Sequence, residues 1–185
     1  MHLLTPSLPC LRQLVAGDLG AASHESGLSF EGPWPDDPEM REGLAVHLTG
    51  CEQNPRDLLW RVYMIADDAL VVGHAGFKGG PGRSGEVEMY WCVEPRWRGR
   101  GIARAAATSL SHYAFSQRAV VAITATIARD NLPSQRVAMA LGMHPVRNEV
   151  KHGLPLWRMA RDGWRVPIAL LPVTTPSAAD HDRVL

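Results

Sequence analysis

The chain reads Val93-Glu94-Pro95-Arg96-Trp97-Arg98-Gly99-Arg100-Gly101-Ile102-Ala103, a turn that contains two glycines and several arginines. Before it, residues 86–93 alternate apolar and polar side chains, which is the pattern of a half-buried strand. After it, Ile102, Ala106 and Leu110 recur at helical spacing. The turn therefore precedes a helix N-terminus, where N–H groups without intrahelical partners and the positive end of the helix dipole favour a phosphate or pyrophosphate.

Gly99 and Gly101 would let a ligand approach the backbone closely, because neither residue carries a Cβ atom. Arg96-x-x-Gly99-x-Gly101, followed by Ala103, resembles the acetyl-CoA signature of the GNAT superfamily of N-acetyltransferases. The resemblance spans about residues 58 to 161 and leans towards the branch of ribosomal-protein N-terminal acetyltransferases. The other matching stretches are Gly73-His-Ala-Gly-Phe-Lys78, residues 85–95 and the second motif, Asn131-x-x-Ser134-x-x-Val137-x-x-x-Leu141-Gly142.

This resemblance implies acetyl-CoA as the cosubstrate and assigns contacts to particular residues. A backbone N–H on the strand, at Val93 or a neighbour, would polarise the acetyl carbonyl. Asn131 would contact the pantetheine arm, although a helix N-cap role alone also explains it. The backbone that would bind the pyrophosphate comprises Arg98, Gly99, Arg100, Gly101, Ile102 and Ala103.

Acetylation requires a neutral amine, and the departing thiolate benefits from a proton donor. Glu88 is the first candidate base because it lies on the strand that leads into the acetyl site, and Glu86 is the second candidate. For both residues the alternative to catalysis is that the carboxylate simply lies on a solvated face of the strand. The family's usual donor is a tyrosine, and Ala138 occupies that position here. Ser134 is the candidate donor instead, while Tyr90, water and a purely structural role for Ser134 stay open.

The order of strands and helices predicts an α/β (α+β) fold, with a mixed, mostly antiparallel central sheet flanked by helices, as in GNAT enzymes. We expect one domain over residues 1–161 and a tail over 162–185 that is partly disordered or docked. A tight hairpin is expected at Asp67-Asp68. The patterns predict strands near residues 8–11, 59–66, 69–78, 86–93, 120–127, 143–150 and 154–161, and helices over 13–24, 37–49, 102–117 and 131–141.

Composition limits the function classes. The chain has 185 residues, 19 basic and 19 acidic side chains and a net charge of zero, which argues against general binding to nucleic acid or anionic membrane. No stretch is long and apolar enough to span a membrane and no secretory leader is evident, so we expect a cytoplasmic protein. Cys10, Cys51 and Cys92 are widely spaced, which predicts reduced thiols, and without an HExxH or CxxC motif we expect no metal.

The expected function is transfer of the acetyl group of acetyl-CoA to a primary amine, by direct attack within a ternary complex. The acceptor would be a small-molecule amine or a peptide N-terminus, and a homodimer is one option. Because the usual tyrosine is absent, an acyl-CoA-binding regulatory domain with little or no activity is the alternative. An acidic loop around Trp34, containing Glu31, Asp36, Asp37 and Glu39, would attract a cationic substrate, although favourable electrostatics in the first turn of a helix explains it more simply.

Overall fold

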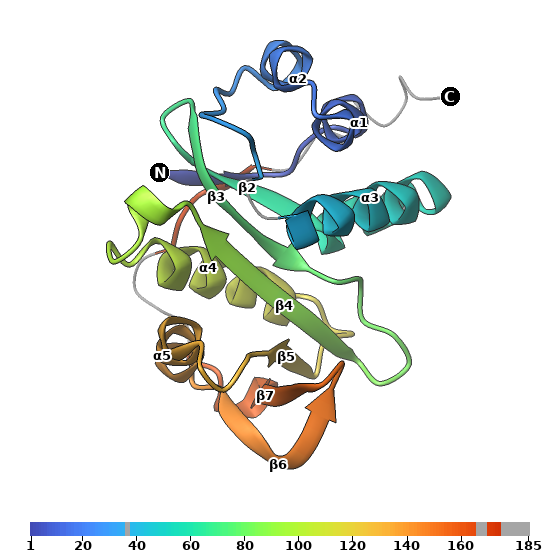
Figure 1. Ribbon diagram of the computed structural model, residues 1–185. Helices are drawn as coiled ribbons and strands as arrows, with labels where there is room; N and C mark the ends of the chain where they lie inside the picture. The colour runs from blue at the N-terminus through green and yellow to red at the C-terminus, as the bar shows by residue number, and fades with distance from the viewer. Residues whose placement is uncertain (36–37, 166–169, 175–185) are drawn as a thin grey trace. The chain divides into compact units, whose positions relative to one another are not determined.

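The computed structural model describes residues 1–35, 38–165 and 170–174 (Figure 1). The chain forms two compact units, one made of Met1–His74 with Pro172–Leu185 and the other of Ala75–Leu171. Strand β3 (Leu70–Phe77) passes from the first unit into the second. In the described part of the chain, no helix is both long and apolar enough to cross a membrane.

The first unit contains a sheet in the order β8-β1-β2-β3. Strand β1 (His2–Leu4) runs antiparallel to β2 (Val62–Asp67) and parallel to β8 (Val173–Thr174). A two-residue turn at Asp68-Ala69 joins β2 to β3, one residue later than predicted, and Asp68 adopts φ 49° there. Strand β2 begins later than expected because a 3₁₀ helix occupies Pro55–Trp60.

The first helices differ from the prediction. The strand expected over residues 8–11 is wrong, since these residues begin helix α1 (Leu8–Ala16). Ser7 caps this helix by accepting a hydrogen bond from the Cys10 N–H, and Pro9 fits in its first turn. The helix expected over residues 13–24 is interrupted, because Gly17 ends α1 with φ 77° and Asp18 caps α2 (Leu19–Ser26).

A third helix, α3 (Pro38–Gln53), completes the first unit and extends beyond the predicted residues 37–49. Strand β2 is buried along almost its whole length, as expected of a strand covered on both faces. Its Val62, Met64 and Ala66 belong to an apolar core shared with the helices. From the helices and loops this core receives Cys10, Leu11, Leu14, Ala22, Leu28, Trp34, Leu44, Cys51 and Leu58.

The second unit contains strands in the order β3-β4-β5-β7-β6. Strand β4 (Glu86–Val93) pairs parallel with β5 (Ala122–Thr126). Strand β7 (Leu154–Ala160) runs antiparallel to both β5 and β6 (His144–Lys151). The mixed, mostly antiparallel sheet with flanking helices is confirmed.

Two helices accompany the sheet of the second unit (Figure 1). Helix α4 (Ile102–Ser116) packs along β4, with Ile102, Ala106 and Leu110 buried on its inner face. Helix α5 (Leu132–Leu141) packs against α4 and ends at Gly142, which has φ 86°. The predicted helices over 102–117 and 131–141 are therefore confirmed to within one residue at each end.

The segment after residue 161 is described only in part. Val173 and Thr174 pair with Leu3 and Leu4 of β1, and the N–H of Leu3 donates to the carbonyl of Pro172 at 2.8 Å. In the second unit, the N–H of Leu171 donates to Oγ of Ser109 on α4 at 2.8 Å. The domain boundary at residue 161 stays a prediction, and residues 166–169 and 175–185 lie outside the described residues.

Candidate functional site

The turn before α4 adopts the backbone conformation that its glycines allow. Pro95–Trp97 form one 3₁₀ turn, and Gly99 and Gly101 then each adopt φ 77°, a left-handed conformation that favours glycine. A Cβ atom placed on either glycine would meet no other protein atom within 4 Å. The two glycines are therefore explained by their backbone conformation and face open space, where a ligand could approach.

The N-terminus of α4 lacks the side-chain cap found on other helices. Ser7, Asp18 and Asn131 cap α1, α2 and α5 with a side-chain oxygen, whereas Gly101 at the N-cap of α4 has no side chain to offer. The first hydrogen bond of α4 runs from the Ala105 N–H to the Gly101 carbonyl. The amides of residues 102–104 precede this bond and are the helix-end donors that an anion would satisfy.

The arginines of the turn stabilise its shape. Nε of Arg98 donates to the carbonyl of Val93 at 2.8 Å, which ties the turn back to the end of β4. Arg100 lies over the Trp97 ring, 4.7 Å from its centroid, and donates to the carbonyl of Arg96 at 3.2 Å. Arg104 is exposed in the first turn of α4, where a cation opposes the helix dipole unless an anion is bound.

Strand β4 separates from its parallel neighbour partway along its length. Glu86–Glu88 pair with Ala122–Thr124 of β5. Beyond this register β4 continues to Val93, while β5 ends at Thr126. The part of β4 nearest the glycine turn therefore extends past the described parallel pairing, so its backbone groups on the β5 side could bind an extended ligand.

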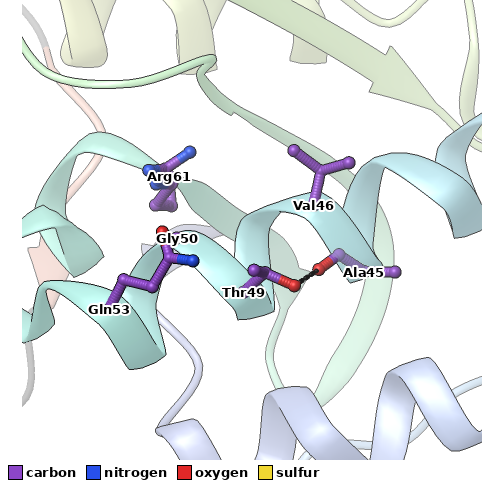
Figure 2. Close-up of a pocket in the computed structure, with 6 residues that line it drawn as sticks. All are labelled: Ala45, Val46, Thr49, Gly50, Gln53 and Arg61. Atoms are coloured by element: carbon purple, nitrogen blue, oxygen red, sulfur yellow. Dashed lines mark hydrogen bonds between the residues drawn. The ribbon is translucent and has the colours of Figure 1, made fainter.

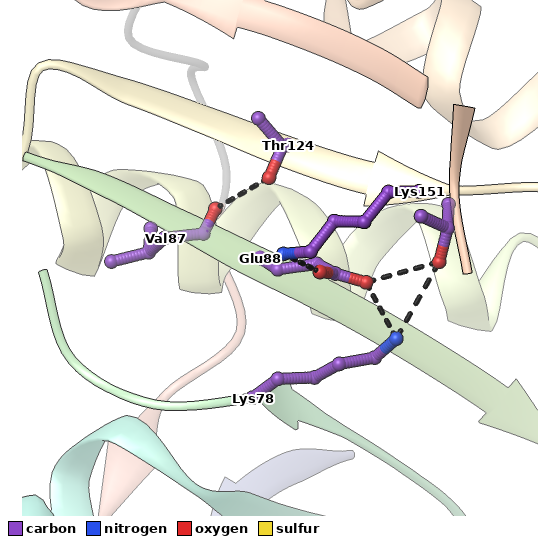
Figure 3. Close-up of polar contacts among 6 residues, drawn as sticks. Lys78, Val87, Glu88, Thr124 and Lys151 are labelled. Carbon is purple, nitrogen blue, oxygen red and sulfur yellow. Dashed lines mark hydrogen bonds and ion pairs between the residues drawn. The ribbon is translucent and has the colours of Figure 1, made fainter. Parts of the chain in front are cut away.

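Glu88 occupies the last paired position of β4, and its side chain is only 5% exposed. Lys78 Nζ lies 2.5 Å from Oε1, and Lys151 Nζ lies 2.6 Å from Oε2 (Figure 3). Thr126 Oγ1 also donates to Oε1 at 3.0 Å. Burial raises the pKa of the Glu88 carboxyl, but the hydrogen bonds from both lysines and Thr126 outweigh burial, so this pKa lies below its ordinary value.

The other candidates lie on α5 and β4. Oδ1 of Asn131 accepts a hydrogen bond from the Ser134 N–H at 3.1 Å, which is the N-cap interaction. Ser134 is half-buried in the first turn of α5, and Ala138 is fully buried one turn further along. Tyr90 is half-buried on β4. The chemical roles of Ser134 and Asn131 stay predictions.

The remaining candidate features belong to the first unit. Trp34 is 3% exposed and packs against Phe30 and His74, with ring centroids 5.2 and 5.8 Å away, so it is a core residue. Asp36 and Asp37 lie outside the described residues. A surface hollow of about 430 Å³ lies along α3 and contains none of the predicted site residues (Figure 2). It is lined by Ala45, Val46, Thr49, Gly50, Gln53 and Arg61.

The described residues contain no group of three His, Cys, Asp or Glu side chains that could hold a metal ion. Cys10 and Cys51 are buried and Cys92 is half-buried, and none of these three cysteines forms a disulfide. Burial raises the pKa of the Cys10 thiol to about 11, which suppresses its thiolate form.

Comparison with known proteins agrees with this geometry. Residues 10–144 match the family model described as "Acetyltransferase (GNAT) domain". The chain therefore belongs to the GNAT acetyltransferase family. It is 30% identical over 148 residues to the "Uncharacterized N-acetyltransferase YjdG" of Bacillus subtilis (strain 168), an alignment that covers 77% of this chain and 84% of that protein.

Solved structures support the same fold. A ribosomal-protein-alanine N-acetyltransferase from Brucella melitensis matches with a TM-score of 0.55 and 21% identity, covering 86% of this chain and 99% of that one. The aminoglycoside acetyltransferase AAC(6')-Ib, in complex with coenzyme A, matches with a TM-score of 0.60 and 12% identity, covering 88% and 95%. At these identities the likeness shows the fold.

Sequence reasoning missed the two lysines on either side of Glu88. Lys78 follows β3 and Lys151 ends β6, so 73 residues of sequence separate them. One signal was available, because Lys78 and Lys151 are the two lysines of the whole chain. In a protein with 19 basic residues, that rarity could have marked both positions for attention.

Proposed function

We propose that this protein is an N-acetyltransferase that binds acetyl-CoA at the turn before α4 and transfers its acetyl group to a primary amine in a ternary complex. The observation that carries the proposal is the N-terminus of α4, which has no side-chain cap and follows a turn with two left-handed glycines. The pyrophosphate of CoA would supply the missing acceptors for these N–H groups. Family membership and the coenzyme A in the AAC(6')-Ib structure support this ligand.

The remaining contacts follow the course of β4 away from the turn. The pantetheine arm would extend along the part of β4 that continues past its pairing with β5, with Asn131 of α5 as a further contact. An N–H at Val93 or a neighbouring β4 residue would polarise the thioester carbonyl. Ser134 would protonate the departing thiolate, with Tyr90 or water as the other donors.

The function is tested by following release of the CoA thiol from acetyl-CoA with a panel of amines, including peptides with free N-termini, polyamines and aminoglycosides. We expect release with at least one class of amine, continuing in the presence of a metal chelator. Acetyl-CoA binding without release for any acceptor would instead support the acyl-CoA-binding regulatory domain. Failure to bind acetyl-CoA would contradict both functions.

Replacing Glu88 with glutamine tests the proposed proton acceptor. If Glu88 takes the amine proton, directly or through water, kcat should fall by roughly 100-fold, the lower end of general-base assistance, because a carboxylate with a lowered pKa is a weak base. The lowered pKa of Glu88 also predicts the pH range over which such a base would act. Because its pKa lies below the ordinary carboxyl value, Glu88 stays ionised through the neutral range, and its contribution is lost only as the pH falls through that lowered pKa.

We therefore expect Glu88→Gln to lower kcat across the plateau of its pH profile. No acidic limb of that profile near neutral pH should shift in this variant. Glu86→Gln separates the two candidate bases, because Glu86 lies two residues earlier on the same face of β4 and pairs with Arg158 at 2.8 Å; it should keep the wild-type rate if Glu88 is the acceptor. A wild-type rate for Glu88→Gln would remove Glu88 as the acceptor. A limb near pH 7 that vanishes in this variant would contradict the lowered pKa.

A further inference from the structure

The two lysines of the chain converge on one buried carboxylate in the second unit (Figure 3). Lys78 and Lys151 each contact a different oxygen of Glu88, so the carboxylate lies between two ammonium groups. The Glu88 side chain is 5% exposed, whereas those of Lys78 and Lys151 are 47% and 49% exposed. The negative charge is therefore buried while both positive groups are open to solvent.

This cluster carries an excess of positive charge. Two ammonium groups and one carboxylate sum to one positive charge, and the next acidic residue along β4, Glu86, is paired with Arg158. An ammonium group has three N–H donors. Among the described residues, Lys78 contacts Glu88 and Thr126, and Lys151 contacts Glu88, so within this part of the chain each half-exposed ammonium has a donor left for a further anion.

The cluster lies at the inner end of the proposed cofactor path. Glu88 is the last β4 residue in the described pairing with β5, and Thr126, which donates to Glu88, is the last residue of β5. An acyl arm that enters from the glycine turn and follows β4 would point its thioester towards this end. An acceptor that attacks the thioester would then come close to Lys78 and Lys151. This step rests on the proposed function.

We propose that Lys78 and Lys151 make the acceptor site selective for amines that carry a carboxylate close to the reacting nitrogen, such as a peptide whose first residues include Asp or Glu. A carboxylate on the acceptor would complete an alternating arrangement with the two ammonium groups and the Glu88 carboxylate. A polycation such as an aminoglycoside or a polyamine would meet two like charges and be disfavoured.

The experiment compares three peptides of equal length with serine first and glutamate, glutamine or lysine second, measured by CoA thiol release. We expect kcat/KM to be at least about tenfold higher for the glutamate peptide than for the lysine peptide, with the glutamine peptide between them. The preference should shrink as salt is added, because both lysines are half-exposed. Equal rates for the three peptides, or a preference for the lysine peptide, would overturn the proposal.

Single variants assign the preference to the lysines. Lys78→Gln and Lys151→Gln should each lower the glutamate-to-lysine ratio by about threefold or more, and each leaves one ammonium to pair with the buried Glu88 carboxylate. Arg147→Gln is the matched control, since Arg147 is an exposed cation on β6 without a contact to Glu88 among the described residues. Arg147→Gln should keep the wild-type ratio of glutamate-peptide to lysine-peptide rates. A fall in this ratio as large as that of the lysine variants would show that the preference arises from the general positive charge of the surface.

A second readout does not depend on turnover. Because Lys78 and Lys151 are the chain's two lysines, an amine-reactive reagent in excess over the peptide amines reports on this cluster once mass spectrometry has separated its label from that on the Met1 α-amine. The glutamate peptide should slow labelling of both lysines, and the lysine peptide should not. Protection of the two lysines from labelling without any CoA release would support the anion site and contradict the proposed function. Release without charge preference or protection would keep the function and refute the site.

Discussion

Replacing Gly101 with valine is expected to weaken acetyl-CoA binding by about 100-fold or more. A side chain at this position meets no protein atom within 4 Å, so it would fill the space through which the pyrophosphate must approach the N–H groups of α4. The φ of 77° also means that valine adds backbone strain of about 1–2 kcal/mol. Calorimetric titration with acetyl-CoA, on protein shown to be folded by circular dichroism, measures the loss.

Gly17→Val provides the matched control for that strain. Gly17 ends α1 with the same φ of 77°, and a Cβ placed there likewise meets nothing within 4 Å. Both variants should therefore lose similar stability, while Gly17→Val should bind acetyl-CoA like the wild type. Unchanged affinity in folded Gly101→Val protein would place the cofactor elsewhere. An equal loss of acetyl-CoA affinity in both variants would mean that destabilisation of the fold causes the loss.

Replacing Arg161 with methionine is expected to lower the free energy of unfolding by about 3 kcal/mol. The Arg161 guanidinium donates from Nε to the carbonyl of Val120 at 2.8 Å, from Nη2 to that of Gln117 at 2.5 Å, and from Nη1 to that of Phe115. These carbonyls belong to the end of α4 and the connection into β5. Methionine keeps much of the side-chain volume but leaves these half-buried acceptors without their charged donor.

Urea unfolding followed by circular dichroism measures this loss, with an unchanged slope against denaturant showing that a comparable surface is exposed. Arg118→Met is the matched control, because Arg118 lies in the same connection and is exposed. It should change the free energy of unfolding by less than about 0.5 kcal/mol. A loss below about 1 kcal/mol for Arg161→Met would mean that water replaces the guanidinium without penalty.

Local sequence signals predicted the elements of the second unit well, for identifiable reasons. The alternation over residues 86–93 corresponds to β4, in which the apolar Val87, Met89 and Val93 are buried, although Glu88 is buried as well. Asn131 and Gly142 define the ends of α5, because an Asx cap and a left-handed glycine are conditions set by one or two residues. The left-handed backbone at Gly99 and Gly101 likewise depends on those two residues alone.

Predictions in the first unit failed where two local signals conflicted. The apolar residues at 8–11 suggested a strand, but Ser7 and Pro9 started a helix there. The spacing of apolar residues over 13–24 suggested one helix, although Gly17 and Asp18 divide it into two. In both cases the capping residues decided the outcome, because they satisfy the backbone groups that a helix end leaves without intrahelical partners.

The sequence by itself determined the family, the glycine turn and the helix that follows it, because each depends on residues close together in the chain. It also placed Glu88 on the strand that leads to the turn. Only the tertiary structure decided the chemical state of Glu88, since Lys78 and Lys151 reach it from the ends of two other strands. The pKa of a buried carboxyl depends on the charges that folding brings within a few ångströms, and those neighbours come from strand pairing rather than from local sequence.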